Sequence, residues 1–443
     1  MGLKVSANST VFQVWLSQVK RTPQRKGVID LASGKDWTLS ALQERVSQAA
    51  TDFSMIKPGA RIAFGGANDS EWLVRFLAIQ MKGGIALALD PMLNFSQRLE
   101  LAQQHEIHFL WEKEKVIALQ KQREIKSSIA FEKLTSGSTG VPKRIPWSHT
   151  NLLKDGEQIL STMGIRPSDR QLGLIPLGHS YGMGSLVMPL ILQGTCMALA
   201  SAFVPTEIPD WIQKHQLTFF PTVPVVLQSL LETPSIQKLG SLRTIVSAGA
   251  RLEPSVAASF YKKFGKKIHN FYGSTETGGI AYDRTGSATA RGEAIGKPLK
   301  GVKIRFDCHN RIIVKSPAVA RRSQFFKVAD LGQWNHKGEL VLMGRVRPMI
   351  NVGGKKIDLA EIEGVLRSIH GIREVWVGVV EQKGREHLIA AVETDQSISW
   401  VMKGIASRLP DWKTPKKVLN LALFPRTSRG KVDGEKIREF FVL

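Results

Sequence analysis

Helix-like and strand-like hydrophobic patterns alternate through the first half of the chain. The spacing of apolar residues predicts helices over 38–51 and 70–80 and strands over 60–64, 84–89, 172–175, 196–200, 219–220 and 244–247. Strands that alternate with helices favour parallel sheets whose faces are covered by helices. The alternation therefore predicts the α/β fold class.

The pattern changes beyond Gly292, where short β-like pieces follow one another. These pieces indicate a small barrel or an antiparallel sheet, and they lie at 302–306, 311–314 and 339–343. A compact α+β unit is predicted after Arg347, with about ninety-five residues, which is long enough for a small domain. Its helices are expected at 359–368 and 398–409, and its strands at 374–380 and 387–392.

Composition limits the partners and the compartment. The formal net charge of +23 favours anionic partners such as nucleotides, acidic proteins, membranes or nucleic acid. No zinc-finger spacing or RNA-binding aromatic signature is present, so nucleic acid is disfavoured. Only Cys196 and Cys308 are present, which predicts no disulfide framework and a reducing, cytoplasmic location. No apolar run is long enough to predict a transmembrane segment.

The segment LTSGSTGVPK at 134–143 is dense in glycine and hydroxyl residues. Glycines permit close backbone approach, hydroxyls add donors and the lysine adds a cation, so together they can wrap a polyphosphate. The residues concerned are Thr135, Ser136, Gly137, Ser138, Thr139, Gly140 and Lys143. Their order is not that of a Walker A loop. A flexible linker is the alternative, weakened by the apolar strand-like stretch before the segment.

A second motif, FYGSTETGG, lies at 271–279. Tyr272 can stack on a base, and Ser274 and Thr275 can donate hydrogen bonds to a phosphate. Glu276 can bind Mg²⁺ through its carboxylate oxygens. The alternative interpretation is a helix capping box, in which a hydroxyl residue is followed by a glutamate.

Two further motifs involve single charged residues. Asp330, in a VADL turn, can accept hydrogen bonds from a ribose diol, although an isolated Asp in a turn is most often structural. Lys431 lies in the glycine-flanked segment PRTSRGKVDG near the C-terminus, where a single lysine is normally just surface.

Together and in this order, the motifs resemble those of the adenylate-forming superfamily: acyl- and aryl-CoA synthetases, peptide-synthetase adenylation domains and luciferases. The resemblance runs from about Trp37 to Lys436. LTSGSTGVPK resembles the phosphate loop, YGSTE the adenine-and-magnesium motif and VAD the ribose position. GRVRPMINVGGKKIDLAEIE resembles the hinge with the A8 loop, and PRTSRGK resembles the A10 loop.

The resemblance implies two domains. A large AMP-binding domain over 1–345 would hold ATP and the acyl pocket in two helix-covered, parallel-type sheets plus a small β-barrel-like subdomain. A small mobile α+β lid over 349–443 would carry Lys431. A hinge near 346–350, with Pro348 at the hinge position, would join them, and Gly353 and Gly354 would line a thiol tunnel.

The implied activity is ATP-dependent activation of a small-molecule carboxylic acid through an acyl- or aryl-adenylate. The acyl group then passes to a thiol, either of CoA or of the phosphopantetheine of an acidic acyl or aryl carrier protein. ATP is the nucleotide and Mg²⁺ the implied metal. Both carboxylate and triphosphate are anions, so cations must neutralise the charge that develops between them.

The resemblance also assigns roles to residues. Lys431 bridges the carboxylate and the α-phosphate, Glu276 holds Mg²⁺, and His179 walls the carboxylate end of the acyl pocket. The phosphate-binding residues are Thr135, Ser136, Gly137, Ser138, Thr139, Gly140, Lys143 and Thr275. The adenine- and ribose-binding residues are Gly249, Ala250, Tyr272, Gly273, Asp330 and Arg345.

The segment PLGHSYGMG at 176–184 and the segment SAGA at 247–250 imply an acyl pocket. Its residues are His179, Tyr181, Gly182, Gly184, Ala248 and Gly249. No Asp is present there to pair with an α-ammonium group, so an α-amino acid is disfavoured. Apolar neighbours favour a fatty or aryl acid, with ordinary core packing as their alternative, and they are Met183, Leu186, Val187 and Met188.

Two departures from the family pattern leave alternatives open. Pro348 stands where the hinge usually has Asp or Lys, and proline fixes φ and restricts Arg347. Arg144 stands where Gly commonly follows P-K, and it either adds a cation near the phosphates or faces solvent. A catalytically weakened adenylate-binding scaffold is therefore the alternative to a ligase. A nucleic-acid or membrane-surface binder is a third hypothesis.

Overall fold

The computed structural model divides the chain into two compact units. It describes residues 9–51, 53, 55–91, 93–113, 115–122, 127–135, 143–319, 325–346, 350–352, 355–357, 359–382, 385–427 and 432–442. The N-terminal unit comprises residues 1–305, 313–328 and 334–341, and the C-terminal unit comprises residues 306–312, 329–333 and 342–443. The functional domain boundaries at 345 and 349 and the hinge between them remain predictions.

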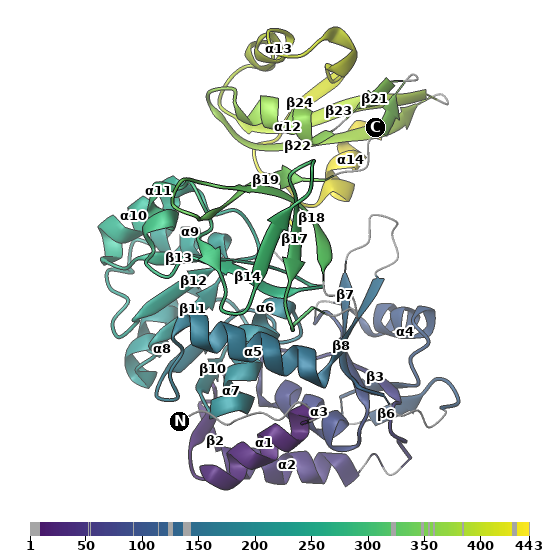
Figure 1. Cartoon of the computed structure of the whole chain (residues 1–443), viewed down its shortest axis with the longest axis vertical. Helices are drawn as coiled ribbons and strands as arrows, with labels where there is room; N and C mark the ends of the chain where they lie inside the picture. The colour runs from purple at the N-terminus through teal and green to yellow at the C-terminus, as the bar shows by residue number, and fades with distance from the viewer. Residues whose placement is uncertain are drawn as a thin grey trace. The chain divides into compact units, whose positions relative to one another are not determined.

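The larger sheet of the N-terminal unit has nine strands in the order β15-β14-β13-β12-β11-β9-β10-β1-β2 (Figure 1). They are β1 (Lys26–Asp30), β2 (Lys35–Thr38), β9 (Arg170–Gly173), β10 (Cys196–Leu199), β11 (Phe219–Thr222), β12 (Thr244–Ser247), β13 (Ile268–Ser274), β14 (Gly278–Tyr282) and β15 (Lys297–Pro298). The six strands from β13 to β1 in this order pair in parallel, while β2, β14 and β15 pair antiparallel at the edges. The predicted α/β fold class is confirmed.

The second sheet has six strands in the order β6-β5-β3-β4-β7-β8. They are β3 (Arg61–Phe64), β4 (Ile85–Ala88), β5 (Phe109–Glu112), β6 (Lys115–Ala118), β7 (Ile129–Thr135) and β8 (Lys143–Ser148). The four central strands are parallel, and β6 and β8 are antiparallel edge strands. The hairpin of β7 and β8 therefore flanks the glycine- and hydroxyl-rich segment.

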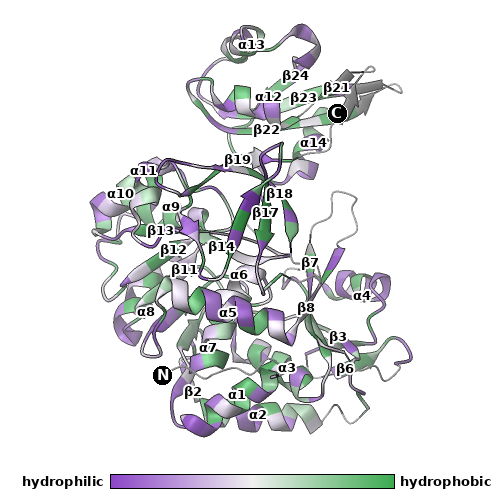
Figure 2. Cartoon of the chain, in the orientation of Figure 1, coloured by the Kyte–Doolittle hydropathy of each residue, from purple (hydrophilic) through white to green (hydrophobic). Residues whose placement is uncertain are grey.

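Helices accompany both sheets, as the alternation predicted. They are α1 (Val11–Arg21), α2 (Leu39–Thr51), α3 (Ser70–Met81), α4 (Phe95–Gln104), α5 (His149–Met163), α6 (Ser180–Gly182), α7 (Met188–Gln193), α8 (Ile208–His215), α9 (Pro224–Glu232), α10 (Pro254–Phe264) and α11 (Ser287–Arg291). A π-helical turn, Met183–Val187, joins α6 to α7, and a 3₁₀ turn, Pro205–Glu207, precedes α8. Figure 2 shows the contrast between α3, which is mostly hydrophobic and buried, and the more polar α4.

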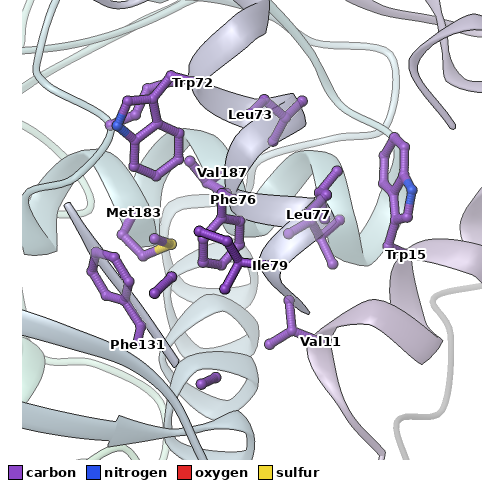
Figure 3. Packing of buried hydrophobic residues seen from close by; sticks show 14 of the residues in the cluster. Val11, Trp15, Trp72, Leu73, Phe76, Leu77, Ile79, Phe131, Met183 and Val187 are labelled. Atoms are coloured by element: carbon purple, nitrogen blue, oxygen red, sulfur yellow. The ribbon is translucent and has the colours of Figure 1, made fainter. Parts of the chain in front are cut away.

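The main core packs α3 against the strand that leads to the glycine-rich segment. Trp72 and Phe76 of α3 stack with ring centroids 5.6 Å apart, and Phe76 meets Phe131 of β7 edge-on at 5.8 Å. Met183 and Val187 of the π-helical turn lie in the same cluster (Figure 3). The apolar residues that the sequence analysis placed around an acyl pocket are thus core residues, namely Met183, Leu186, Val187 and Met188.

Four strands form a separate sheet in the order β16-β17-β18-β19. They are β16 (Lys303–Phe306), β17 (Arg311–Lys315), β18 (Phe326–Trp334) and β19 (Leu340–Arg345). The predicted short strands beyond Gly292 are therefore confirmed. Asp330 lies inside β18, so its prediction as a turn residue was wrong. The hydrophobic alternation on both sides of this residue extends the strand through it.

The C-terminal unit contains a three-stranded sheet, β22-β23-β24, and a two-stranded hairpin, β20-β21. The strands are β20 (Ile350–Val352), β21 (Lys355–Ile357), β22 (Ile372–Gln382), β23 (Arg385–Thr394) and β24 (Lys417–Asn420). Its helices are α12 (Leu359–Arg367), α13 (Ile398–Ala406), the 3₁₀ turn Asp411–Lys413 and α14 (Gly434–Val442). One core buries Ile362 and Ile405 against the sheet, and another buries Trp376 and Phe441. The predicted α+β unit is confirmed.

In the part of the chain that the structure describes, no helix is both long and apolar enough to cross a bilayer.

Candidate functional site

Several predicted site residues follow the carboxyl ends of neighbouring parallel strands. Such ends meet at one edge of a sheet, and ligands of open α/β sheets bind there. Register aligns Ser247 of β12 with Asn270 of β13, so the segment after β12 and the last residues of β13 lie at the same edge. These segments hold Ala248, Gly249, Ala250, Tyr272 and Gly273. The fold therefore gathers the predicted adenine-binding residues.

The segment with His179 is attached to this same edge. Tyr181 donates a hydrogen bond from Oη to the carbonyl oxygen of Val246 at 2.8 Å. Its ring lies 5.5 Å from that of Phe271, centroid to centroid. His179 begins the short helix α6 and is partly buried. The structure thus brings the predicted acyl-pocket segment beside the predicted adenine-binding segments.

The glycines of this segment are required by packing. A Cβ atom on Gly182 would lie 2.2 Å from the carbonyl oxygen of Pro176. A Cβ on Gly184 would lie 2.6 Å from Ile159 Cδ1 and 2.9 Å from Asp155 Oδ2. The sequence analysis attributed both glycines to pocket volume, whereas their immediate neighbours in the structure are backbone and buried side chains.

The motif YGSTE forms the turn between β13 and β14, which spans residues 275–277 and is called the β13–β14 turn below. Ser274 Oγ accepts a hydrogen bond from the Thr277 amide at 3.3 Å and lies 3.0 Å from Thr277 Oγ1. A strand follows this turn, not a helix, so the alternative of a helix capping box is wrong. A strand pair needs a tight reversal, and the hydroxyls supply its local hydrogen bonds.

Two buried side chains of other elements hold the β13–β14 turn. Trp147 of β8 donates a hydrogen bond from Nε1 to the carbonyl oxygen of Thr275 at 2.9 Å. Asp155 of α5 accepts a hydrogen bond at Oδ1 from the Gly279 amide at 2.8 Å. The side chain of Thr275 and that of Glu276 are both partly exposed. The turn is therefore fixed from the protein side while its two predicted ligand-binding side chains reach toward solvent.

A buried lysine completes this support. Lys133 of β7 is 3% exposed, and its Nζ lies 3.7 Å from the centroid of the Trp147 ring. Burial lowers the pKa of Lys133 to about 7, although Asp155 and Glu276 act to raise it. Burial raises the pKa of Asp155 to about 6, opposed by Lys133 and by the Gly279 amide. Sequence analysis did not identify Lys133, Trp147 or Asp155, because their meeting depends on the packing of β7, β8 and α5.

The predicted phosphate loop is described only at its ends. Thr135 and Lys143 face one another as the last residue pair of the β7–β8 hairpin, and Lys143 is exposed. The predicted residues between them lie outside the described residues, and they are Ser136, Gly137, Ser138, Thr139 and Gly140. The pairing of Thr135 with Lys143 in the hairpin brings the two ends of the segment close together.

Arg144 follows this segment and pairs with two acidic side chains. Its Nη1 lies 3.4 Å from Glu132 Oε2, and its Nη2 lies 3.9 Å from Glu106 Oε2. Only 23% of the side chain is exposed. Arg144 is opposite Leu134 in the sheet, so Glu132, two residues along β7 on the same face, is its diagonal neighbour. The expectation that Arg144 simply faces solvent was wrong, and a cation near the phosphates stays a prediction.

The predicted ribose-binding residues pair within the C-terminal unit. Arg345 Nε donates a hydrogen bond to Asp330 Oδ1 at 3.0 Å. The Asp330 side chain is 16% exposed and that of Arg345 is 63% exposed. The Val346 amide also donates to the carbonyl oxygen of Ala329, which joins the end of β19 to β18. The guanidinium thus holds one carboxylate oxygen in a fixed direction.

Other predictions fall on residues that the structure leaves undescribed. These are Lys431, Pro348, Gly353 and Gly354. The catalytic lysine, the hinge position and the thiol tunnel therefore stay predictions. Described β20 and β21 pair Val352 with Lys355, so they form a hairpin on either side of the tunnel glycines.

The residues present fit a magnesium ion that is bound largely by its nucleotide. Mg²⁺ is usually held by one or two carboxylates together with substrate phosphates and water. Glu276 supplies one such carboxylate at the β13–β14 turn. Among the described residues, no three or more His, Cys, Asp or Glu side chains gather as a metal cluster. A site of this kind would therefore depend on the phosphates for its remaining ligands.

A cavity of about 410 Å³ opens elsewhere in the N-terminal unit. It is lined by residues of β1, β2, α2 and α3, among them Asp30, Trp37 and Arg45. None of the site residues predicted from the motifs lines it. The cavity therefore adds nothing to the site assembled above.

A model of the AMP-binding enzyme family matches residues 102–315 of this chain. The matched residues are similar to the AMP-binding domain of the adenylate-forming superfamily. Oxalate–CoA ligase of Saccharomyces cerevisiae is 25% identical over 353 residues, which are 71% of this chain and 64% of that protein. The aligned region thus spans less than two thirds of the yeast protein. Feruloyl-CoA synthase of an Amycolatopsis species is 26% identical over 92% of this chain and 94% of that protein.

Solved structures show the same fold. O-succinylbenzoate coenzyme A synthetase (MenE) of Bacillus subtilis, in complex with ATP and magnesium ion, has a TM-score of 0.77 and 24% identity. The match covers 95% of this chain and 98% of that one. Other relatives include further CoA ligases and peptide synthetases. The superfamily resemblance inferred from the motifs is confirmed.

Proposed function

We propose that this protein is an AMP-forming acid–thiol ligase that activates a fatty or aryl acid with ATP. The observation that supports the proposal most directly is the convergence of three motifs in the N-terminal unit. The His179 segment, the segment 248–250 and the β13–β14 turn lie at one sheet edge, and the turn is bound to the hairpin that carries the phosphate segment. Nucleotide, acid and metal would meet there.

In the first step, an oxygen of the substrate carboxylate attacks the α-phosphorus of ATP. A bond forms between them, the bond from the α-phosphorus to the β-bridging oxygen breaks, and pyrophosphate leaves. Thr275 would donate to the α-phosphate, and the residues at 135–143 would bind the β- and γ-phosphates. Magnesium, when bound through Glu276, would neutralise the charge on the leaving pyrophosphate.

In the second step, a thiolate attacks the acyl carbonyl carbon of the adenylate. The new carbon–sulfur bond forms, the carbon–oxygen bond to AMP breaks, and the thiol proton passes to solvent or base.

Asp330, held by Arg345, would bind the ribose hydroxyls and keep the α-phosphorus aligned for the first step. Lys431 would bridge the carboxylate and the α-phosphate in that first step only.

The substrate class rests on the pocket segment and on the relatives. Apart from His179 and Ser180, the residues at 176–184 are glycine, tyrosine and apolar residues, and the adjoining segment 248–250 carries no charge. The feruloyl-CoA synthase relative acts on an aryl acid by its name, and the long-chain-fatty-acid–CoA ligase relative acts on fatty acids. CoA is the acceptor in both names. The excess positive charge of the chain suits either CoA or an acidic carrier protein.

Carboxylate-dependent exchange of labelled pyrophosphate into ATP tests the proposal. The full chain is incubated with MgATP, labelled pyrophosphate and a panel of fatty and aryl acids. Label should enter ATP only when a cognate acid is present. Silence across the panel, with AMP binding retained, would favour a scaffold without turnover. A second assay, with CoA against a phosphopantetheinylated carrier protein, then identifies the thiol.

A further inference from the structure

Lys133 is a buried lysine packed against Trp147, the side chain that holds the β13–β14 turn. Its Nζ has no hydrogen-bond acceptor among the described residues, and the residue is 3% exposed. An unpaired ammonium in a protein interior costs several kcal/mol unless a nearby charge or ring offsets it. The Trp147 ring from β8 lies 3.7 Å from Lys133 Nζ, and the charges of Asp155 from α5 and Glu276 from the turn both act to raise the pKa of Lys133. The charged form of Lys133 is therefore stabilised in part by the negative charge at the turn.

The geometry separates the parts that these neighbours play. Asp155 already uses Oδ1 to accept the Gly279 amide at 2.8 Å, and Trp147 uses Nε1 to bind the Thr275 carbonyl. These two hydrogen bonds fix the backbone on both sides of Glu276. Neither of them restrains the Glu276 side chain. Lys133 is the buried cation whose charge attracts that carboxylate.

We propose that Lys133 is a positioning residue for Glu276. Its buried ammonium attracts the Glu276 carboxylate and limits the orientations of that side chain, so that the carboxylate is available to the metal of a bound triphosphate. The charge of Asp155 favours the ammonium form against the effect of burial, and the Trp147 ring packs against it. This inference rests on the proposed function, because it assigns Glu276 to the metal of MgATP.

The comparison of MgATP with AMP isolates the metal-dependent part of binding. AMP lacks the β- and γ-phosphates, so its binding does not need the metal carboxylate. Binding of each nucleotide to the full chain is measured by calorimetric titration, and the thermal midpoint is measured without ligand. Replacing a residue that supports a metal ligand typically lowers the metal affinity by about 10- to 100-fold. We expect Lys133→Met to weaken MgATP binding by about that factor and to leave AMP binding unchanged.

A double variant separates positioning from stability. Lys133→Met alone leaves Asp155 as an unpaired buried carboxylate, which can destabilise the fold. In Lys133→Met with Asp155→Asn both charges are gone, and the amide oxygen still accepts from Gly279. We expect this double variant to regain the thermal midpoint of the wild type and to keep the weakened MgATP binding. If Lys133 had a purely structural role, the double variant would instead recover both the thermal midpoint and MgATP binding.

A second pair tests whether Lys133 acts through Glu276. If it does, Lys133→Met added to Glu276→Gln should weaken MgATP binding no further, because coupled residues are non-additive. Lys154→Met is the matched control, since Lys154 is a partly exposed lysine next to Asp155 that pairs with Glu157 at 2.8 Å. It should leave binding of both nucleotides unchanged.

Three results would overturn the inference. The first is normal MgATP binding in Lys133→Met with Asp155→Asn, and the second is a further loss of MgATP affinity when Lys133→Met is added to Glu276→Gln. The third is an equal loss of affinity for AMP and for MgATP in Lys133→Met. A wild-type chain that binds neither nucleotide would refute the proposed function, and the role of Lys133 with it. If the wild type binds MgATP and exchanges pyrophosphate while Lys133→Met binds it equally well, only the role of Lys133 fails.

Discussion

Two pairs of opposite charges, one in each compact unit, differ in burial. Lys133 and Asp155 in the N-terminal unit are 3% and 2% exposed, whereas Arg345 in the C-terminal unit has a side chain that is 63% exposed. The exposed pair has a direct hydrogen bond at 3.0 Å, and the buried lysine has none among the described residues. A direct hydrogen bond between two charged side chains therefore does not show how much the pair contributes to the stability of the fold.

The difference follows from solvation. Water screens the Asp330–Arg345 pair, so its contribution to stability is close to zero, and its proposed role is to fix a carboxylate for the ribose. No water screens Lys133 and Asp155, so removing either partner leaves an uncompensated charge in the interior. The buried pair should affect both folding and metal-dependent binding, and the exposed pair should affect binding alone.

The largest expected effect on stability is at the buried pair. Asp155→Ala removes the partner of Lys133 and the acceptor of the Gly279 amide, so the free energy of unfolding should fall by about 3–5 kcal/mol. Denaturant unfolding followed by tryptophan fluorescence measures it. A loss below about 1 kcal/mol would show that the buried charges are solvated after all.

The largest expected effect on chemistry lies outside both pairs. Lys431→Ala should lower acid-dependent pyrophosphate exchange by about 10²–10³-fold, because a cation that stabilises developing charge is lost. Thioester formation from a preformed adenylate should change far less. Single-turnover assays measure the rate of each half-reaction, and the fold-loss in adenylate formation is compared with the fold-loss in thioester formation. Equal losses in both would contradict the role assigned to Lys431.

A buried histidine extends the comparison to pH. Burial lowers the pKa of His149 to about 4, and its Nδ1 accepts the Val11 amide at 3.2 Å. The unfolded chain therefore binds the proton first as pH falls from about 6.5 to 4, so stability present above pH 6.5 is lost across that range, by at most about 3 kcal/mol. His149→Asn can keep an acceptor without titrating, and it should flatten this part of the pH–stability curve. An unchanged slope in that variant would assign the pH dependence to other groups.

The smallest expected effect on stability is at the exposed pair. Asp330→Asn and Arg345→Met should each change the free energy of unfolding by less than about 1 kcal/mol. Asp330→Asn should nevertheless weaken AMP binding clearly, because the ribose loses a charged acceptor. Titration with AMP and denaturant unfolding are carried out on the same samples. A large loss of stability with unchanged AMP binding would reverse the contrast between the two pairs.

Much of the fold was predictable from local pattern. The apolar spacing over 70–80 and the short apolar run over 84–89 correspond to α3 and β4, because one buried face sets a period that the sequence shows directly. Asp330 was placed in a turn because a lone Asp favours turns, yet it lies in β18, where pairing with neighbouring strands outweighs local preference.

The site shows the same limit more clearly. The motifs around Thr135, Tyr272 and Glu276 are contiguous in sequence, so they could be recognised and ordered without coordinates. Lys133, Trp147 and Asp155 stand alone in their segments, and a lone lysine, tryptophan or aspartate indicates no site. Arg144 was misjudged for the same reason, because Glu132 is its neighbour only across the sheet.

By itself, the sequence determined the superfamily, the alternation of helices and strands, and the residue types available for binding a nucleotide. Those properties are local, since each depends on residues that are near one another along the chain. Only the tertiary structure decided which side chains support the β13–β14 turn and which apolar residues belong to the core. Charges separated by more than a hundred residues interact strongly only when packing brings them together and removes the water between them.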